Sequence, residues 1–196
     1  MTEIAEGAAA PAFTMPASGG RSASSAALQG KPYLLYFYPK ADTPGCTTQA
    51  CGIQEALPQL GKLKLEVIGV SPDPVAKIEK FAAKYGLTFP LAADEDHAVA
   101  EAYGVWVEKS MYGKKYMGVA RTTYVIAPDG KVALRIDKVR PEGHAEEVIA
   151  AIKALTSAAC MPSNSASSAS TKARSSPRTK AKTPRASTST PASKRR

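Results

Sequence analysis

Two cysteines five residues apart are the residues of this chain best suited to covalent chemistry. Cys46 and Cys51 follow a turn-forming segment, and the apolar residues after Cys46 recur at the spacing of an amphipathic helix. We therefore expect Cys46 at or just inside a helix N-terminus, where unpaired backbone N–H groups and the helix macrodipole favour an anion. Because the thiolate is the reactive form of cysteine, this position predicts thiol redox chemistry.

The spacing of the cysteines also sets a geometric condition on any disulfide between them. On an ideal helix, Cys51 would lie about 140° around from Cys46, with their Cα atoms about 8–9 Å apart. A disulfide needs Cα atoms within about 7 Å of each other. If both residues start on one intact helix, they can bond only after its first turns unwind. The alternative is that both cysteines are inert, small apolar residues.

The elements that would position these cysteines follow an α/β pattern. An apolar and aromatic run at 33–38 predicts a buried strand, and the residues from Pro39 to Gly45 predict the turn that ends it. Further strands are predicted at 65–70, 89–93, 122–127 and 132–136, and further helices at 75–85, 97–103 and 142–155. This order indicates an α/β domain with a mixed central β-sheet flanked by helices around a thioredoxin-like core.

The turn before Cys46 also matches a known signature. Pro39, Thr43 and Cys46 fit the pattern Pro-x-x-x-Thr/Ser-x-x-Cys, so the chain resembles the peroxiredoxins. With Cys51 at plus five, it is similar to the peroxiredoxin Q subfamily, also called bacterioferritin comigratory protein, whose atypical two-cysteine members form an intramolecular disulfide within one helix. The resemblance covers most of residues 1–156, with further matching segments at 10–14, 94–97, 103–106 and 113–126.

The resemblance implies a role for individual residues. Cys46 would be the peroxidatic nucleophile that becomes a sulfenic acid, and Cys51 the resolving thiol that forms the redox disulfide with it. Arg121 matches the catalytic arginine, and a guanidinium keeps its charge at any working pH, so it can stabilise a neighbouring thiolate. Thr43 corresponds to the hydroxyl that hydrogen-bonds thiolate and peroxide, and Pro39 to the ring that shields the sulfur from water. Substrate binding would thus involve Thr43, Cys46 and Arg121.

Several of these residues also have simpler interpretations. Pro39 and Thr43 are common turn formers, and Arg121 taken alone would be a solvated charge at a strand edge. Gln49 stands where many peroxiredoxins carry Glu. Its side chain can still accept a hydrogen bond, so we interpret it as a tolerated variation.

A metal site is not expected. Cys46 and Cys51 lack a second nearby pair of ligands, as a zinc or iron–sulfur site would need. The two histidines, His97 and His144, are expected at the surface rather than as ligands. We predict no metal and no cofactor.

The charge of the chain is divided unevenly. All 17 acidic residues lie before Ser157 together with 17 of the 26 Lys and Arg residues, so the remaining nine give 157–196 the whole formal net charge of +9. This segment is rich in Ser, Thr, Pro and Ala and has no aromatic residue, which predicts disorder. We therefore predict a thioredoxin-like peroxiredoxin domain at 1–156 and a disordered basic tail at 157–196.

The predicted tail has two interpretations. Its charge could contact nucleic acid or another anionic surface through phosphates, with strong salt dependence. The favoured alternative is a solubilising extension, because no aromatic residue is interleaved to stack on bases. Cys160, beside the tail, is expected to be an incidental thiol.

The location predicted from the sequence is the cytoplasm. No apolar run reaches the roughly 18 residues of a membrane span, and residues 1–16 lack the pattern of a signal peptide. A reducing compartment also suits a catalytic cysteine pair that must be recycled.

The function predicted from these features is that of a thiol-dependent peroxidase acting on hydrogen peroxide and organic hydroperoxides. The resemblance implies thioredoxin or a similar dithiol protein as reductant, and a monomer. Two other classes stay open. A protein-disulfide oxidoreductase would more naturally carry Cys-x-x-Cys, and a nucleic-acid-associated protein would act through residues 157–196.

Overall fold

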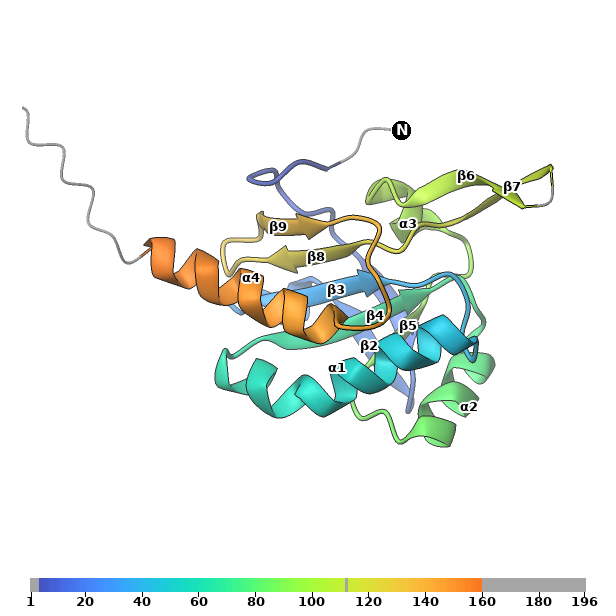
Figure 1. Ribbon diagram of the computed structural model, residues 1–196, viewed down its shortest axis with the longest axis horizontal. Helices are drawn as coiled ribbons and strands as arrows, with labels where there is room; N and C mark the ends of the chain where they lie inside the picture. The colour runs from blue at the N-terminus through green and yellow to red at the C-terminus, as the bar shows by residue number, and fades with distance from the viewer. Residues whose placement is uncertain (1–3, 112, 160–196) are drawn as a thin grey trace, which may run out of the picture. The chain divides into compact units, whose positions relative to one another are not determined.

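A computed structural model describes residues 4–111 and 113–159 (Figure 1). The strands are β1 (Thr14–Ala17), β2 (Arg21–Ser24), β3 (Tyr33–Phe37), β4 (Glu66–Ser71), β5 (Leu91–Ala93), β6 (Trp106–Met111), β7 (Lys114–Val119), β8 (Thr123–Ile126) and β9 (Val132–Ile136). The helices are α1 (Pro44–Lys62), α2 (Val75–Tyr85), α3 (Ala98–Ala102) and α4 (His144–Ala159), with a short 3-10 helix at Ala26–Leu28.

A seven-stranded mixed sheet in the order β2-β1-β5-β4-β3-β8-β9 forms the centre of the fold. Strand β3 pairs in parallel with β4 and antiparallel with β8, and all of its residues are buried. Because successive side chains of a strand point to opposite faces, Leu34 and Tyr36 join one apolar cluster while Leu35 and Phe37 join the other. The predicted α/β fold with a mixed central sheet is confirmed.

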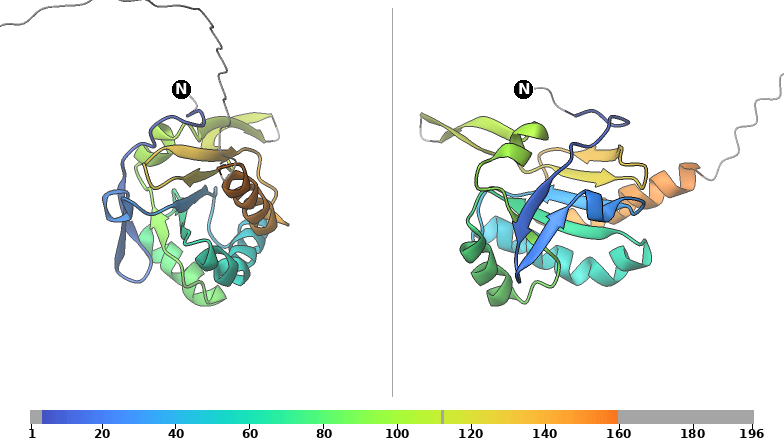
Figure 2. Two further views of the ribbon diagram at one scale, coloured as in Figure 1. Left: turned by 90° about the vertical axis from the view of Figure 1, so that its left-hand side faces the viewer. Right: turned by 180° about the vertical axis from the view of Figure 1, so that it is seen from behind.

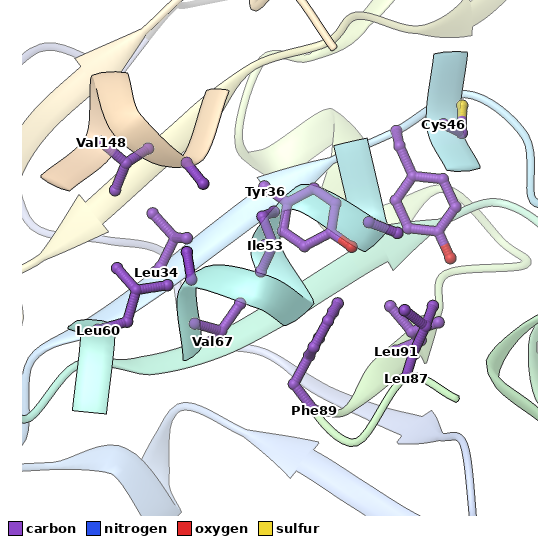
Figure 3. Packing of buried hydrophobic residues seen from close by; sticks show 14 of the residues in the cluster. Leu34, Tyr36, Cys46, Ile53, Leu60, Val67, Leu87, Phe89, Leu91 and Val148 are labelled. Carbon is purple, nitrogen blue, oxygen red and sulfur yellow. The ribbon is translucent and has the colours of Figure 1, made fainter. Parts of the chain in front are cut away.

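Two apolar clusters cover the two faces of this sheet. On one face, α1, α2 and α4 pack against the strands (Figures 1 and 2). On the opposite face lie the N-terminal segment and α3. Figure 3 shows part of the first cluster, which includes Val148 of α4, Tyr36 of β3 and Ile53 of α1, with Cys46 at one end. The first turn of α1 is therefore attached to the main core.

The elements predicted from the sequence agree with the structure to within a few residues, and α2 has the predicted bounds. Two hairpins were not predicted: β1 with β2, and β6 with β7, which forms a separate two-stranded sheet. Much of β7 is exposed and β2 consists of small or polar residues, so neither shows the apolar alternation that indicates a half-buried strand.

The C-terminal helix α4 continues to Ala159, past the domain boundary predicted at residue 156. Residues 160–196 lie outside the described residues, so the two-part division, the disorder of 157–196 and the interpretation of Cys160 stay predictions. Among the helices of the described residues, none combines the length and the apolar character needed to cross a membrane.

Gly69 of β4 tests how tightly the core packs under α1. A Cβ at this position would lie 2.7 Å from Leu91 Cδ2 and 2.7 Å from the phenol of Tyr36, and both side chains are buried. We expect Gly69→Ala to lower the free energy of unfolding by about 1–3 kcal/mol, measured by denaturant titration. Gly61→Ala is the matched control, because a Cβ there meets nothing within 4 Å. Equal stability of the two variants would contradict this account of the packing.

Candidate active site

The first turn of α1 carries Cys46. Thr43 precedes the helix in an extended conformation (φ −104°, ψ 150°), and Pro44, whose ring presets a helical φ, occupies the first helical position. The first hydrogen bond of the helix runs from the Thr47 N–H to the Thr43 carbonyl at 2.8 Å. Cys46 therefore lies in the turn where backbone N–H groups have no partner within the helix, as predicted. Its side chain is only 2% exposed.

Arg121 brings a positive charge to the Cys46 sulfur. Its Nη2 donates to Sγ at 3.3 Å, while Nη1 donates to the Gly45 carbonyl at 3.2 Å and to Gln49 Oε1 at 2.9 Å. A Cβ on Gly45 would lie 3.1 Å from Nη2, so the absence of a side chain there leaves room for the guanidinium. The arrangement can stabilise a thiolate by charge and by a hydrogen bond together.

The pairing of β8 with β3 determines where Arg121 lies. Arg121 comes two residues before β8, and the Phe37 N–H donates to the Thr122 carbonyl at 2.9 Å. Strand β3 leads directly into the turn before α1, so this register places Arg121 beside that turn. The Val139 N–H donates to the Arg121 carbonyl at 3.2 Å and holds the backbone from the other side.

Side-chain hydrogen bonds hold the turn between β3 and α1 in place against the neighbouring elements. The Asp73 carboxylate accepts the Ala41 N–H at 2.6 Å. Asp42 adopts a left-handed backbone (φ 60°), and its carboxylate accepts hydrogen bonds from Lys84 Nζ at 2.9 Å and the Tyr85 hydroxyl at 2.8 Å. These two hydrogen bonds lower the pKa of Asp42, with Lys84 as the larger cause. Helix α2 therefore helps to fix the approach to the helix start.

The other predicted site residues lie in the same region. The Thr43 hydroxyl donates to the Lys40 carbonyl at 3.1 Å, and a hydroxyl that donates one hydrogen bond can still accept others. Pro39 is half-buried in the same turn. Cys51 lies on α1, five residues after Cys46, and both cysteines are free thiols. Cys51 borders a hollow of about 250 Å³ between α1 and the start of α4.

His144 is not the surface residue that the sequence predicted. It is 1% exposed at the first position of α4. Its Nδ1 lies 3.3 Å from Gln49 Nε2, and its Nε2 lies 2.9 Å from Thr123 Oγ1. Burial, and next the charge of Arg121, lower the pKa of His144 to about 4.

The pattern of α4 contained a signal for the burial of His144. His144, Val148 and Ile152 follow one another at four-residue intervals, so they share the helix face that packs inward. The prediction that His144 lies at the surface was wrong because it did not extend this apolar face back to residue 144. His97, the other histidine, is half-buried, and its ring stacks on Trp106 with centroids 3.9 Å apart.

Within 4–111 and 113–159, no group of three or more His, Cys, Asp or Glu side chains is placed to hold a metal ion.

Known proteins resemble this chain in both sequence and structure. The profile of the AhpC/TSA family matches residues 7–135. Peroxiredoxin Bcp of Escherichia coli is 42% identical over 149 residues, which are 76% of this chain and 96% of that protein. Peroxiredoxin Q of Xanthomonas campestris aligns with a TM-score of 0.69 and 41% identity over 72% of this chain and 90% of its own. A cysteine-to-serine mutant of PrxQ from Xylella fastidiosa aligns with a TM-score of 0.75 and 32% identity, covering 80% and 99% of the two chains.

The chain therefore belongs to the AhpC/TSA family of thioredoxin-like proteins. Within that family it is a peroxiredoxin of the Bcp and peroxiredoxin Q type, and thus a thiol-dependent peroxidase.

The buried His144 predicts a specific dependence of stability on pH. A histidine with a pKa near 6.5 when unfolded and about 4 when folded binds its proton more readily in the unfolded chain. Its contribution is fully present above pH 6.5 and is lost as the pH falls towards 4, by about 3 kcal/mol of unfolding free energy. We expect this part of the acid destabilisation to disappear in His144→Leu, measured by denaturant titration between pH 4 and 7.

The control for this comparison is His97→Asn, because asparagine tolerates the left-handed backbone of residue 97 (φ 62°). The same titration of this variant shows how much of any change comes from the loss of a histidine as such. Parallel pH profiles for the unmodified protein and His144→Leu would show that His144 is not the group responsible.

Proposed function

We propose that this peroxiredoxin reduces hydrogen peroxide and organic hydroperoxides through Cys46, with Cys51 as the resolving thiol. The observation that carries the proposal is the contact of 3.3 Å between Arg121 Nη2 and Cys46 Sγ in the first turn of α1. A charged donor and a helix N-terminus both favour negative charge on this sulfur. The bacterioferritin comigratory protein of Xanthomonas campestris, 40% identical to this chain, is described as having alkyl peroxide reduction activity, which supports organic hydroperoxides as one substrate class.

In the first step, the Cys46 thiolate attacks one oxygen of the peroxide bond. The sulfur–oxygen bond forms as the oxygen–oxygen bond breaks, which leaves Cys46 as a sulfenic acid and releases water or an alcohol once the departing oxygen takes a proton. Negative charge grows on that oxygen in the transition state, so a positioned donor lowers the barrier. Arg121 is suited to this role, and Pro39 would shield the sulfur. The Thr43 hydroxyl would act as a second donor after its proton turns from the Lys40 carbonyl towards the reacting oxygen.

In the second step, the Cys51 thiol attacks the sulfenic sulfur, a disulfide forms and water leaves. Both cysteines lie on the continuous helix α1, with Cα atoms about 8–9 Å apart for this spacing. A disulfide needs them within about 7 Å. The start of α1 must therefore unwind before the bond forms. Cys51 itself is half-buried and borders a surface hollow.

An external dithiol would complete the cycle by thiol–disulfide exchange, becoming a disulfide itself as both cysteines return to thiols. Thioredoxin is the reductant that the resemblance implies, and we propose it together with a monomeric state and a cytoplasmic location. Contact of residues 157–196 with nucleic acid or an anionic surface stays a prediction, because most of that segment lies outside the described residues.

Single-turnover kinetics separate the two proposed cysteine roles. We expect Cys46→Ser to abolish the fast reaction of the reduced protein with hydrogen peroxide, because the nucleophile is removed. Cys51→Ser should keep that first turnover, accumulate a sulfenic acid detectable by dimedone labelling and mass spectrometry, and fail to recycle with thioredoxin.

Unmodified protein and Cys46→Ser consuming peroxide equally slowly would contradict the peroxidase assignment. Normal recycling by Cys51→Ser would instead show that another thiol resolves the sulfenic acid, with Cys160 as the first residue to test.

A further inference from the structure

A chain of polar contacts leads from the Cys46 sulfur to the start of α4. Arg121 Nη2 contacts Sγ, and Arg121 Nη1 lies 2.9 Å from Gln49 Oε1. Gln49 Nε2 lies 3.3 Å from His144 Nδ1, and His144 Nε2 lies 2.9 Å from Thr123 Oγ1. Gln49, His144 and Thr123 are each at most 1% exposed, so water cannot easily replace any of these partners.

The chemistry of these groups fixes the direction of every hydrogen bond in the chain. Arginine only donates, so the Gln49 atom that faces it must be the carboxamide oxygen. The Gln49 NH₂ group then faces His144 and donates to Nδ1, which must be unprotonated. A neutral imidazole carries its proton on the other nitrogen, so His144 Nε2 donates to the Thr123 hydroxyl. One tautomer of His144 is thereby selected.

We propose that His144 is a positioning residue for the peroxidatic site: it holds the Gln49 carboxamide in the orientation that presents oxygen to Arg121, and so holds Arg121 against Cys46. The inference rests on the proposed roles of Cys46 and Arg121. Without an acceptor at residue 144, the carboxamide can rotate and turn its NH₂ group towards the guanidinium. Two donors would then face each other, and Arg121 Nη1 would lose the shorter of its two hydrogen bonds and keep only the one to the Gly45 carbonyl.

The surroundings of His144 keep it in the neutral form that this arrangement requires. Arg121 lies close enough to oppose a second positive charge, and the ring centroid of Tyr36 lies 6.1 Å from that of the imidazole. Cys51 and Glu55 of α1 and Glu142, just before α4, line the same hollow as His144. On its own helix, Glu146 and Glu147 are exposed. Burial is the larger cause of the lowered pKa of His144, so the ring stays neutral at pH 7.

A double-mutant cycle tests whether His144 acts through Gln49. The measured quantity is the second-order rate constant of reduced protein with hydrogen peroxide in a single turnover at pH 7. We expect His144→Leu to lower it about tenfold or more, since a small displacement of a catalytic group has effects of this order. His144→Asn should retain more of the rate, because its side chain can offer an oxygen near the place of Nδ1. In a Gln49→Leu background, His144→Leu should have no further effect.

The matched control is His97→Asn, which should react at the rate of the unmodified protein. An equal loss from His144→Leu in both backgrounds would overturn the proposal, since His144 would then act independently of Gln49. Failure of the unmodified protein to react with peroxide would be a failure of the proposed function, which distinguishes the two ideas.

A measurement that needs no activity assay and leaves His144 and Gln49 unchanged tests the same inference. The chain has two histidines, so the ring nitrogens can be assigned by ¹⁵N NMR with His97→Asn as a reference. At pH 7, His144 should show an unprotonated Nδ1 and a protonated Nε2. The opposite tautomer, or a charged ring, would overturn the proposal, because neither could accept the hydrogen bond from Gln49.

Discussion

The proposed peroxide chemistry depends on the hydrogen bond that Arg121 donates to the Cys46 sulfur. The two residues are 75 positions apart in the chain, so no local element can bring them together. The sulfur is almost completely buried, and a thiolate there would lose its hydration unless the protein supplied a replacement. A guanidinium that donates from 3.3 Å supplies both charge and a hydrogen bond.

The fold produces this contact through the position of β3 in the sheet. Its parallel pairing with β4 requires a crossover, which α1 provides, and the crossover begins with the turn that carries the site. Its antiparallel pairing with β8 places Arg121 beside that same turn. Helix α4 then closes over α1 and contributes His144 from a third part of the chain. In the proposed cycle, this helix end stays ordered during the peroxide reaction and unwinds for disulfide formation.

The sequence was sufficient for much of this arrangement because the main signals are local. The apolar run of β3, the turn residues after it and the amphipathic pattern of α1 all agree, and they predicted Cys46 in a first helical turn. The mixed sheet followed from the alternation of elements and the β8–β9 hairpin signal. The resemblance to a known family supplied the pairing of Arg121 with Cys46, which no spacing argument could have given.

The features that were missed depend on packing between distant segments. The β6–β7 hairpin has exposed residues on both strands, including Tyr116 and Met117 on β7, so its sequence shows no buried face. The role of His144 depends on a polar residue at an inward position of α4 meeting another polar residue, Gln49, on α1. Pattern rules that treat polar residues as solvated cannot find such a pair, because each compensates for the burial of the other.

The decisive measurement is the rate of the first turnover with hydrogen peroxide in Arg121→Gln. We expect a loss of about a hundredfold or more at pH 7, the order found when a donor to a developing negative charge is removed. Arg21→Gln removes the same charge from β2 and should react like the unmodified protein. A folded Arg121→Gln protein that reacts at the rate of the unmodified protein would show that the contact between Arg121 and Cys46 does not drive the reaction.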